Sequence, residues 1–429
     1  MGARMAGPAI RSAALAQQLA QRFDVTVLHP QHLEDGFELE GVTIVAREPR
    51  YRWFQKFLRD FDAVLTQPLR MHVQHALVRS GVTVVYDMYV PGMLEMVSSQ
   101  ASEHEEDNPV GQRHTRRVHL DMQSALRSGN AFVCASERQR DYWLGALTAL
   151  GRVDVAGHRS DPSGDALIGV IPFGIPDEPP VHDTPVMRGV IDGIGEDDTV
   201  LLWAGGIWNW LDPLTPIKAA ARTREELPNL RLCFMASVHP NPELRMQMMS
   251  RALELATELG VLGERVFFLD KWVPYEQRHN FLLEADAGIS GHFDSLETRF
   301  AFRTRFLDHI WGGLPTLTTQ GSSLSDMLIE ADAALGVPER DVDGWIDAMR
   351  MITTDTQRRA VMAHNTALLR EQFTWRAIGA DLTDFLERAM AAGQGSARTA
   401  RRWMPEYLWV QTRLQGPLGA VRKLLRTLR

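Results

Sequence analysis

Residues 287–318 read AGISGHFDSLETRFAFRTRFLDHIWGGLPTLT. The apolar run Ala287–Ser290 opens this stretch and Thr316–Thr318 closes it, and both runs are typical of buried strands. A charged segment lies between them and ends in a Gly-Gly-Leu-Pro turn at 312–315. Two buried strands joined by a helical segment predict parallel pairing, because a parallel connection has to cross over the sheet.

Short runs of β-branched and apolar residues recur between helical patterns along the whole chain. In the first half they are Val25–Leu28, Val42–Val45, Ala63–Leu65, Val82–Tyr86, Ala131–Cys134 and Val170–Ile171. In the second half they are Val200–Ala204, Leu230–Phe234, Val266–Leu269, Ala287–Ser290, Thr316–Thr318 and Ala334–Gly336. The two series predict an α/β fold with two doubly wound, Rossmann-like domains.

Prolines mark the boundary between the two domains, since the segment PFGIPDEPP at 172–180 can continue neither a helix nor a central strand. We expect a first domain at 1–172, a linker at 173–190 and a second domain at 191–375. A closing helix and hinge at 376–396 could pack on either domain. Gly7 opens the first glycine loop almost at the chain's start. Either the true start lies upstream, or the first domain lacks its central first strand.

The composition is that of a globular protein, with 429 residues, 45% hydrophobic and 23% charged. Cys134 and Cys233, the only cysteines, lie in apolar runs, so we expect neither a disulfide framework nor a paired-cysteine zinc site. We find no apolar stretch that could span a membrane and no signal peptide pattern, and we expect a cytoplasmic protein. The net charge of −8 argues against nucleic acid as a partner.

The C-terminal tail at 397–429 differs from the rest, with eight basic residues and one acid, Glu406. Apolar residues at 418, 421, 425 and 428 follow helical spacing, and basic residues at 422, 423, 426 and 429 lie on the other side. This pattern predicts a basic amphipathic helix that could hold the protein on an anionic membrane surface as a peripheral protein. The alternative is a helix that packs on a neighbouring subunit.

Three glycine loops could present backbone N–H groups to a ligand, at Gly7, at Gly205 and Gly206, and at Gly291. The segment after Gly291 is the most informative, because it holds two carboxylates and three arginines. These residues are Glu297, Arg299, Arg303, Arg305 and Asp308. Arginines bind phosphate and carboxylates accept hydrogen bonds from sugar hydroxyls, so the mixture suits a nucleotide-sugar. The alternative is an exposed, salt-bridged helix face.

The second half resembles the donor half of retaining glycosyltransferases of GT-B fold, in the broad family 4 group. The resemblance is carried by VFFL at 266–269, WVP at 272–274, LLEAD at 282–286, ETRF at 297–300 and GLP at 313–315. The front half is similar through AGPAIR at 6–11 and VIPFG at 170–174. The resemblance implies two domains that face each other across a cleft, transfer with retention, and no metal or other cofactor.

The resemblance also implies roles for the charged residues. Asp308 should hold the ribose hydroxyls of the donor, and Glu297 should lie beside the transferred sugar. The backbone N–H groups of Thr298, Arg299 and Phe300 should lie near sugar and phosphate. Lys271 and Val273 occupy the family's base-binding position, while Gly7, Gly205 and Gly206 permit a close approach to the diphosphate.

This chain departs from the family in two respects. Ten residues rather than seven separate Glu297 and Asp308, and the second carboxylate is Asp instead of Glu. The family's basic residues for the diphosphate should fall near 207–212, where this chain has IWNWLD. Arg299, Arg303 and Arg305 are the candidates to replace them.

The acceptor chemistry should come from the first domain. Asp87, after the strand at 82–86, could orient or deprotonate an acceptor hydroxyl, or it could cap the next helix. His292 is a possible sugar contact. The Asp-x-Asp spacings at 60–62 and 341–343 are interpreted as chance, and no metal site is expected.

We therefore expect a glycosyltransferase that moves a hexosyl or deoxyhexosyl group from a nucleotide-sugar to a glycan, a lipid-linked acceptor or a small molecule. Two alternatives remain open at this point. One is a nucleotide-sugar epimerase, and the other is a degenerate, non-catalytic binding partner with the same fold.

Overall fold

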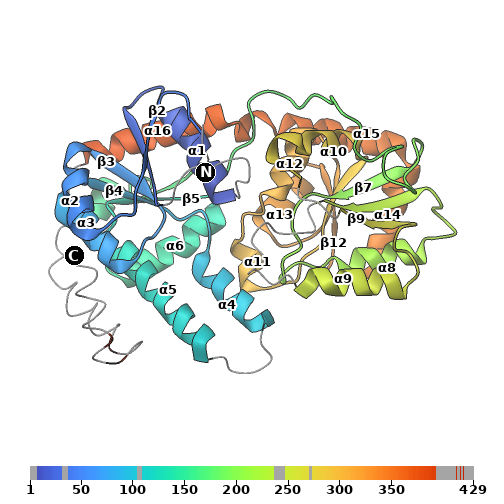
Figure 1. Cartoon of the computed structure of the whole chain (residues 1–429), viewed down its shortest axis with the longest axis horizontal. Helices are drawn as coiled ribbons and strands as arrows, with labels where there is room; N and C mark the ends of the chain where they lie inside the picture. Colours follow the sequence, from blue (N-terminus) through green and yellow to red (C-terminus); the bar gives the residue numbers. More distant parts are fainter. Residues whose placement is uncertain are drawn as a thin grey trace.

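A computed structural model describes residues 7–30, 37–103, 109–235, 247–269 and 273–392, with the single residues 412, 416 and 419. Its described part forms two α/β domains side by side, each with helices packed around parallel strands (Figure 1). The tail at 397–429 lies outside the described residues apart from those three positions. Among the described residues, no helix is long and apolar enough to cross a membrane.

The second domain holds one six-stranded parallel sheet with the order β12-β11-β10-β7-β8-β9. Its first strand lies at the centre, which is the Rossmann arrangement. The strands are β7 (Thr199–Trp203), β8 (Leu230–Phe234), β9 (Val266–Phe268), β10 (Ala287–Ser290), β11 (Thr316–Thr319) and β12 (Ala334–Val337). The helices are α8 (Leu214–Arg222), α9 (Gln247–Glu258), α10 (Arg278–Glu284), α11 (Leu296–Phe300), α12 (Arg305–Gly312), α13 (Ser323–Glu330), α14 (Val342–Thr354) and α15 (Thr356–Leu368).

The first domain is divided into two sheets, a four-stranded sheet of order β3-β4-β5-β6 and a separate pair β1-β2. All of the pairings are parallel. The strands are β1 (Val25–His29), β2 (Val42–Ala46), β3 (Ala63–Thr66), β4 (Thr83–Asp87), β5 (Ala131–Cys134) and β6 (Ile168–Val170). The helices are α1 (Gly7–Leu19), α2 (Tyr51–Phe57), α3 (Met71–Ser80), α4 (Gly92–Glu103), α5 (Pro109–Ser128), α6 (Glu137–Ala149) and α7 (Val155–Ser160).

Each expected apolar run overlaps one of these strands, and the expected α/β class is confirmed. Within the described residues of the first domain, no strand joins β1 to β3. The two explanations considered from the sequence, an upstream start and a missing first strand, both stay open because residues 1–6 lie outside the described part.

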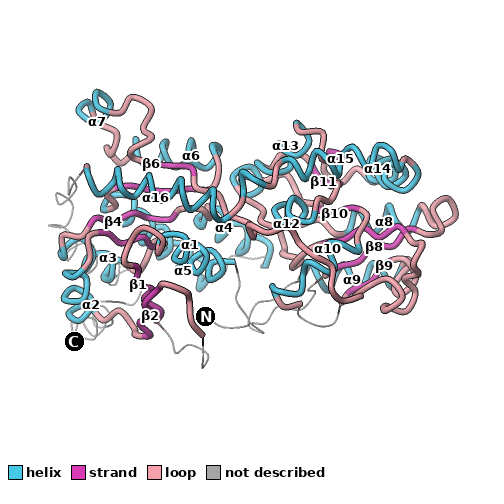
Figure 2. Tube along the Cα trace, turned by 90° about the horizontal axis from the view of Figure 1, so that it is seen from above, coloured by secondary structure: helices cyan, strands magenta, loops and turns pink. Residues whose placement is uncertain are grey.

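The chain crosses between the domains twice, and the two crossings lie side by side. Ile175 and Thr374 form an isolated parallel bridge, in which the Ile175 N–H donates to Phe373 O over 2.8 Å and the Trp375 N–H donates to Ile175 O over 2.9 Å. Helix α16 (Trp375–Ala391) then packs on α1 and β4 of the first domain, as Figures 1 and 2 show. The closing helix therefore returns to the first domain, which the sequence left open.

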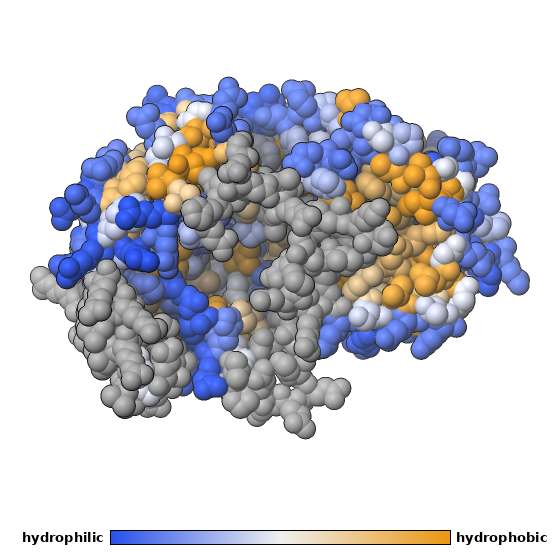
Figure 3. Space-filling view, viewed as in Figure 1, coloured by the Kyte–Doolittle hydropathy of each residue, from blue (hydrophilic) through white to orange (hydrophobic). Residues whose placement is uncertain are grey.

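Side chains of α6 hold the two domains together. Arg138 donates to Gly321 O over 2.9 Å and to Asp326 Oδ2 over 2.7 Å in the second domain. The Gln139 amide donates to Tyr89 O and to Phe300 O, both over 2.9 Å, so it bridges the domains directly. On the side of the molecule that Figure 3 shows, polar residues form much of the rim and apolar residues gather in a patch on each domain.

Candidate functional site

A cavity of about 260 Å³ lies between the two domains. The first domain contributes a segment that follows β4, and the second contributes the loop after β7 and the segment after β10. It is lined by Tyr89, Val90, Pro91, Glu95, Ala204, Gly205, Gly206, Trp208, Trp210, Leu211, Glu297, Ala301, Phe302, Arg303, Thr304, Arg305 and Asp308. Ligands of parallel α/β sheets bind at this end of the strands, outside their carboxyl ends.

Glu297 is buried at the wall of this cavity, with 1% of its surface exposed. The short helix α11 places it there, and Ser295 caps that helix by accepting a hydrogen bond from the Thr298 N–H. Arg303 donates to Glu297 Oε2 and to Thr298 Oγ1, both over 2.8 Å. Nε of Arg303 is buried and has no hydrogen-bond partner. The Arg303 guanidinium therefore has hydrogen-bond partners at Nη2 but none at Nε.

Arg305, the first residue of α12, is the second cation of the cavity, and its side chain is partly buried. Its guanidinium lies 4.7 Å from the ring centre of Trp203 and donates to Gly206 O over 2.8 Å. Its Nη1 is buried without a partner. Burial, and after it the charge of Arg303, lowers the pKa of Arg305 to about 9. A desolvated cation with an unused N–H is costly unless an anion binds it, so this position suits a phosphate group.

Asp308 lies on the same helix, one turn after Arg305, and also lines the cavity. Arg278 donates to Asp308 Oδ1 over 2.8 Å. The Arg278 guanidinium packs on the rings of Tyr275 and Trp311, 3.4 Å and 4.4 Å from their centres. These contacts fix the Asp308 carboxylate, which is a requirement for selective hydrogen bonding to ligand hydroxyls. Arg278 was not among the residues expected from the sequence.

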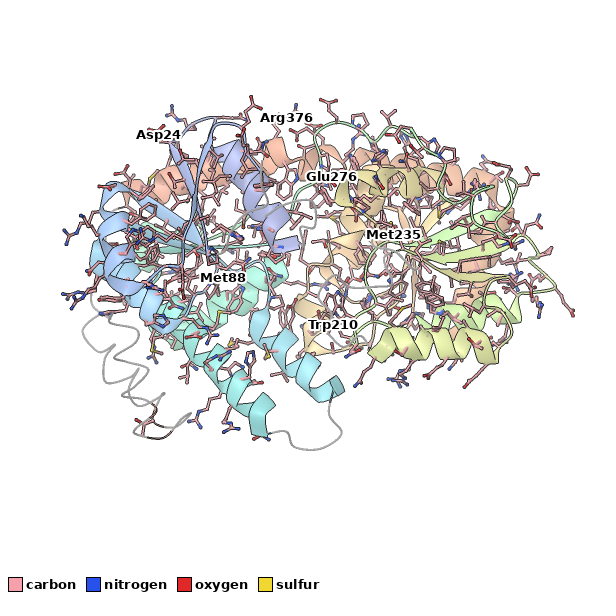
Figure 4. All side chains as sticks on the ribbon, viewed as in Figure 1. Asp24, Met88, Trp210, Met235, Glu276 and Arg376 are labelled. Carbon is pink, nitrogen blue, oxygen red and sulfur yellow. The ribbon has the colours of Figure 1, made fainter. Side chains whose placement is uncertain are left out.

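The loop after β7 offers aromatic faces where the resemblance leads one to expect basic residues. Trp208 and Trp210 are stacked, with ring centres 5.4 Å apart and planes 3° from parallel, and both line the cavity. Trp210 lies on the second-domain side of the space between the domains (Figure 4). Gly205 in this loop has φ +109°, and no atom lies within 4 Å of where its Cβ would be. A side chain there would be strained by the backbone and not by lack of space.

Asp212, which closes this loop, has a structural role. Its Oδ1 accepts from the Leu214 and Thr215 N–H groups, both over 3.1 Å, and its Oδ2 accepts from the Thr215 hydroxyl over 2.5 Å. It thus satisfies free N–H groups at the start of α8. Among the described residues, Arg303 and Arg305 are the only cations that line the cavity.

Asp87 is engaged by Arg11 of α1 and does not line the cavity. Nε and Nη2 of Arg11 donate to the two carboxylate oxygens over 2.7 Å and 3.0 Å, and both residues are buried. Arg11 also donates to the carbonyls of Ile171 and Pro172, over 2.9 Å and 2.5 Å. Asp87 therefore fixes the arginine that joins the first helix to the interdomain crossing. Because Arg11 engages both oxygens of Asp87, the geometry of this carboxylate favours neither proton transfer nor helix capping.

Other expected donor residues lie away from the cavity wall. Arg299 is exposed. Phe300 packs on Tyr142 of α6 with ring centres 4.9 Å apart, so it serves the contact between domains. Val273 packs against the apolar core cluster that both domains share. Gly7 opens α1 beside open space and is not among the lining residues. Lys271 lies outside the described residues.

His292 is fully buried rather than turned to the cavity. Its backbone N–H donates to Thr319 Oγ1 over 3.2 Å, and its Nε2 lies 3.2 Å from Gln320 O. Burial and the charge of Arg303 lower its pKa well below the usual value, so the ring is neutral. Among the described residues, no group of three or more His, Cys, Asp or Glu side chains is placed to hold a metal ion.

Glu95 is a cavity residue that the sequence reasoning missed. It lies in the first turn of α4, and α4 packs against α11 of the other domain. Burial raises its pKa to about 7, the Glu297 charge adds to this effect and Arg303 opposes it. The available signal was an acid in the first turn of a helix that begins after a strand and Pro91.

No protein family model and no curated protein matches the chain. Solved structures do match over most of its length. HepE from Anabaena, in complex with UDP, is 13% identical, with a TM-score of 0.64 over 90% of this chain and 98% of that one. Sucrose-phosphate synthase from Thermosynechococcus elongatus is 15% identical, with a TM-score of 0.59 over 90% and 94%. WaaG, a glycosyltransferase involved in lipopolysaccharide biosynthesis, is 16% identical, with a TM-score of 0.58 over 87% and 94%.

The chain has a GT-B fold. Its two Rossmann-like domains match these neighbours, and each match covers about nine tenths of this chain. At these identities the likeness shows the fold, and the activity depends on the residues of the site.

Proposed function

We propose that the protein is a glycosyltransferase that moves a sugar from a nucleotide-diphosphate donor to a glycan, lipid-linked or small-molecule acceptor. Buried N–H groups in the interdomain cavity carry this proposal. Arg303 Nε and Arg305 Nη1 are desolvated and unpartnered, so a diphosphate would supply the acceptors that they lack. The solved complexes of HepE with UDP and with UDP-glucose agree with such a donor.

The remaining cavity groups fit the rest of a nucleotide-sugar. Asp308, oriented by Arg278, is placed to hold ribose hydroxyls, and Glu297, oriented by Arg303, to contact the transferred sugar. Gly205 and Gly206 leave room for the diphosphate to approach the backbone. Arg303 and Arg305 would stabilise the charge that develops on the leaving diphosphate. We propose that the two arginines take the place of a metal ion at the diphosphate, and transfer with retention is proposed on the resemblance alone.

Arg305 gives a direct test with a matched control in Arg299, because both are arginines of the same segment and only Arg305 lines the cavity. Binding of UDP, GDP and dTDP, and of the matching nucleosides, is measured by calorimetry. Arg305→Ala should weaken binding of the preferred diphosphate by roughly 10- to 150-fold, since one charged hydrogen bond contributes about 1.5–3 kcal/mol. Nucleoside binding should hardly change, and Arg299→Ala should bind both ligands as the unmodified protein does.

Equal losses for diphosphate and nucleoside would remove Arg305 from the diphosphate site. Turnover is measured separately, as release of nucleoside diphosphate from a nucleotide-sugar without acceptor. Tight binding without any release would favour the non-catalytic binding partner over the transferase. Cytoplasmic location stays a prediction. Membrane attachment through 397–429 also stays a prediction, because only positions 412, 416 and 419 of the tail are described.

A further inference from the structure

Two tryptophans of the loop after β7 give the cavity a wall that the charged residues of the proposed donor site do not explain. Trp208 and Trp210 are half-buried, line the cavity and stack with ring planes 3° from parallel. Both also pack against the apolar core that lies within the second domain. The two rings therefore form a supported aromatic surface at the cavity, and they bring no charge to it.

Hydrogen bonds of the loop hold these rings in place. Asn209, between the two tryptophans, accepts at Oδ1 from the Met248 N–H in the first turn of α9 over 3.0 Å. The Asp212 N–H donates to Gly291 O, in the segment after β10, over 2.9 Å. The loop is thus tied to two other parts of the domain. An aromatic surface fixed in this way loses little conformational entropy when a ligand stacks on it.

The order of the cavity groups indicates which part of a donor would meet the tryptophans. This step rests on the proposed function, which gives Asp308 the ribose and Arg305, one turn before it on α12, the diphosphate. Arg305 donates to Gly206 O, so the diphosphate position lies beside the loop, two residues before Trp208. The sugar is the part of a nucleotide-sugar that follows ribose and diphosphate. The same order therefore brings the sugar of a bound donor to the tryptophan loop.

The face of an indole ring carries partial negative charge, and it attracts the weakly positive C–H bonds on the face of a pyranose ring. A hydroxyl pressed against the same surface loses water without gaining a hydrogen bond. Replacing the 6-hydroxyl of a hexose by hydrogen enlarges its apolar surface. We propose that Trp208 and Trp210 form a stacking platform for the transferred sugar, and that this platform selects a 6-deoxyhexose over the parent hexose.

Calorimetry tests the platform without an acceptor. The base is whichever of UDP, GDP and dTDP binds best. The probes are then the nucleoside, its diphosphate, the hexose donor (UDP-glucose, GDP-mannose or dTDP-glucose) and the 6-deoxy form of that donor. The sugar increment is the dissociation constant of the nucleoside diphosphate divided by that of the nucleotide-sugar. In the unmodified protein it should exceed 1 and should be larger for the 6-deoxy donor.

Trp208→Ala and Trp210→Ala should each lower the sugar increment, by about 2- to 12-fold for the ring that contacts the sugar, which is the range of one aromatic contact. Affinity for the nucleoside diphosphate should stay within about 2-fold, which also shows that the variants are folded. The matching Phe variants should keep most of the increment, because a smaller ring still stacks. Trp53→Ala is the control, since it removes a half-buried tryptophan of α2 that does not line the cavity. It should bind every probe as the unmodified protein does.

Four results would overturn the platform. They are a sugar increment that survives in both alanine variants, equal binding of the hexose and 6-deoxy donors, and losses in the alanine variants that are as large for the nucleoside, or for the diphosphate, as for the nucleotide-sugar. The last two would assign the rings to the base or to the diphosphate. Diphosphate binding without any sugar increment in the unmodified protein would remove this inference alone. Absence of diphosphate binding would remove the proposed function, and this inference with it.

Discussion

Each domain places an arginine with buried donor atoms near the interdomain crossing or cavity, and the two arginines are used differently. Arg11 in the first domain donates hydrogen bonds to both Asp87 oxygens and to two backbone carbonyls. Arg305 in the second domain donates to one carbonyl and keeps a buried Nη1 without a partner. A buried cation with its donors used holds the fold together, whereas one with a donor left over is ready for a ligand.

The sheets of the two domains also differ. In the second domain β7 joins β8 to β10, so six strands form one sheet. In the first domain β1 and β3 belong to different sheets, with no strand between them among the described residues. The strand before the first helix is the one that joins the two halves of a doubly wound sheet. The domain that we propose to bind the donor is thus built on the continuous sheet.

The largest effect is expected from removing Arg11. Arg11→Met should lower the free energy of unfolding by about 3–5 kcal/mol, because it leaves Asp87 charged and buried without a partner. Urea unfolding measures this loss. Arg305→Met is the matched change in the second domain, and it should alter stability by no more than about 1 kcal/mol, since Arg305 is only partly satisfied. A loss in Arg305→Met as large as that in Arg11→Met would remove the contrast between the two arginines.

Hydrogen exchange should separate the two sheets. Amides of β1 and β3 should exchange on the order of 100-fold faster than those of the central strand β7, because an open sheet edge unfolds locally at lower cost. Mass spectrometry of peptic peptides that cover 25–29, 63–66 and 199–203 would measure this difference. Equal protection in all three would mean that residues outside the described ranges cover the edges of β1 and β3.

Local sequence patterns were sufficient for the strands, because alternation and apolar runs depend on neighbouring residues only. They also placed Glu297, Arg303, Arg305 and Asp308 in one site, since these residues follow a single strand within twelve positions. Because a single segment carries all four residues, their proximity follows from the local sequence.

The partners of the site residues were beyond such patterns. Arg11 and Asp87 are 76 residues apart, and Arg278 and Asp308 are 30 apart. Only the fold brings these pairs together, and the local sequence around each residue does not specify its partner. Glu95 was missed for the same reason, because its surroundings come from the other domain.

The smallest effect concerns Glu95 and pH. Its pKa rises from the ordinary 4.5 to about 7 on folding, so the folded protein binds this proton more tightly than the unfolded chain does. The stabilisation from this proton is complete below about pH 4.5, is lost as the pH rises through about 7, and is absent above that. Glu95→Gln mimics the protonated form, so its free energy of unfolding should exceed that of the unmodified protein by about 1–3 kcal/mol at pH 8.5.

At pH 4.5 the two proteins should differ little, because Glu95 is then protonated in the folded state. Urea unfolding at both pH values, with Glu137→Gln as the exposed control, measures the difference. The gain at pH 8.5 should shrink when salt screens the repulsion between Glu95 and Glu297, although burial leaves most of it in place. A Glu95→Gln protein that is less stable than the unmodified one at pH 8.5 would mean that the charged carboxylate is favourably bound. Glu95 would then be held by an attractive contact in the cavity, and the repulsion from Glu297 would not dominate its surroundings.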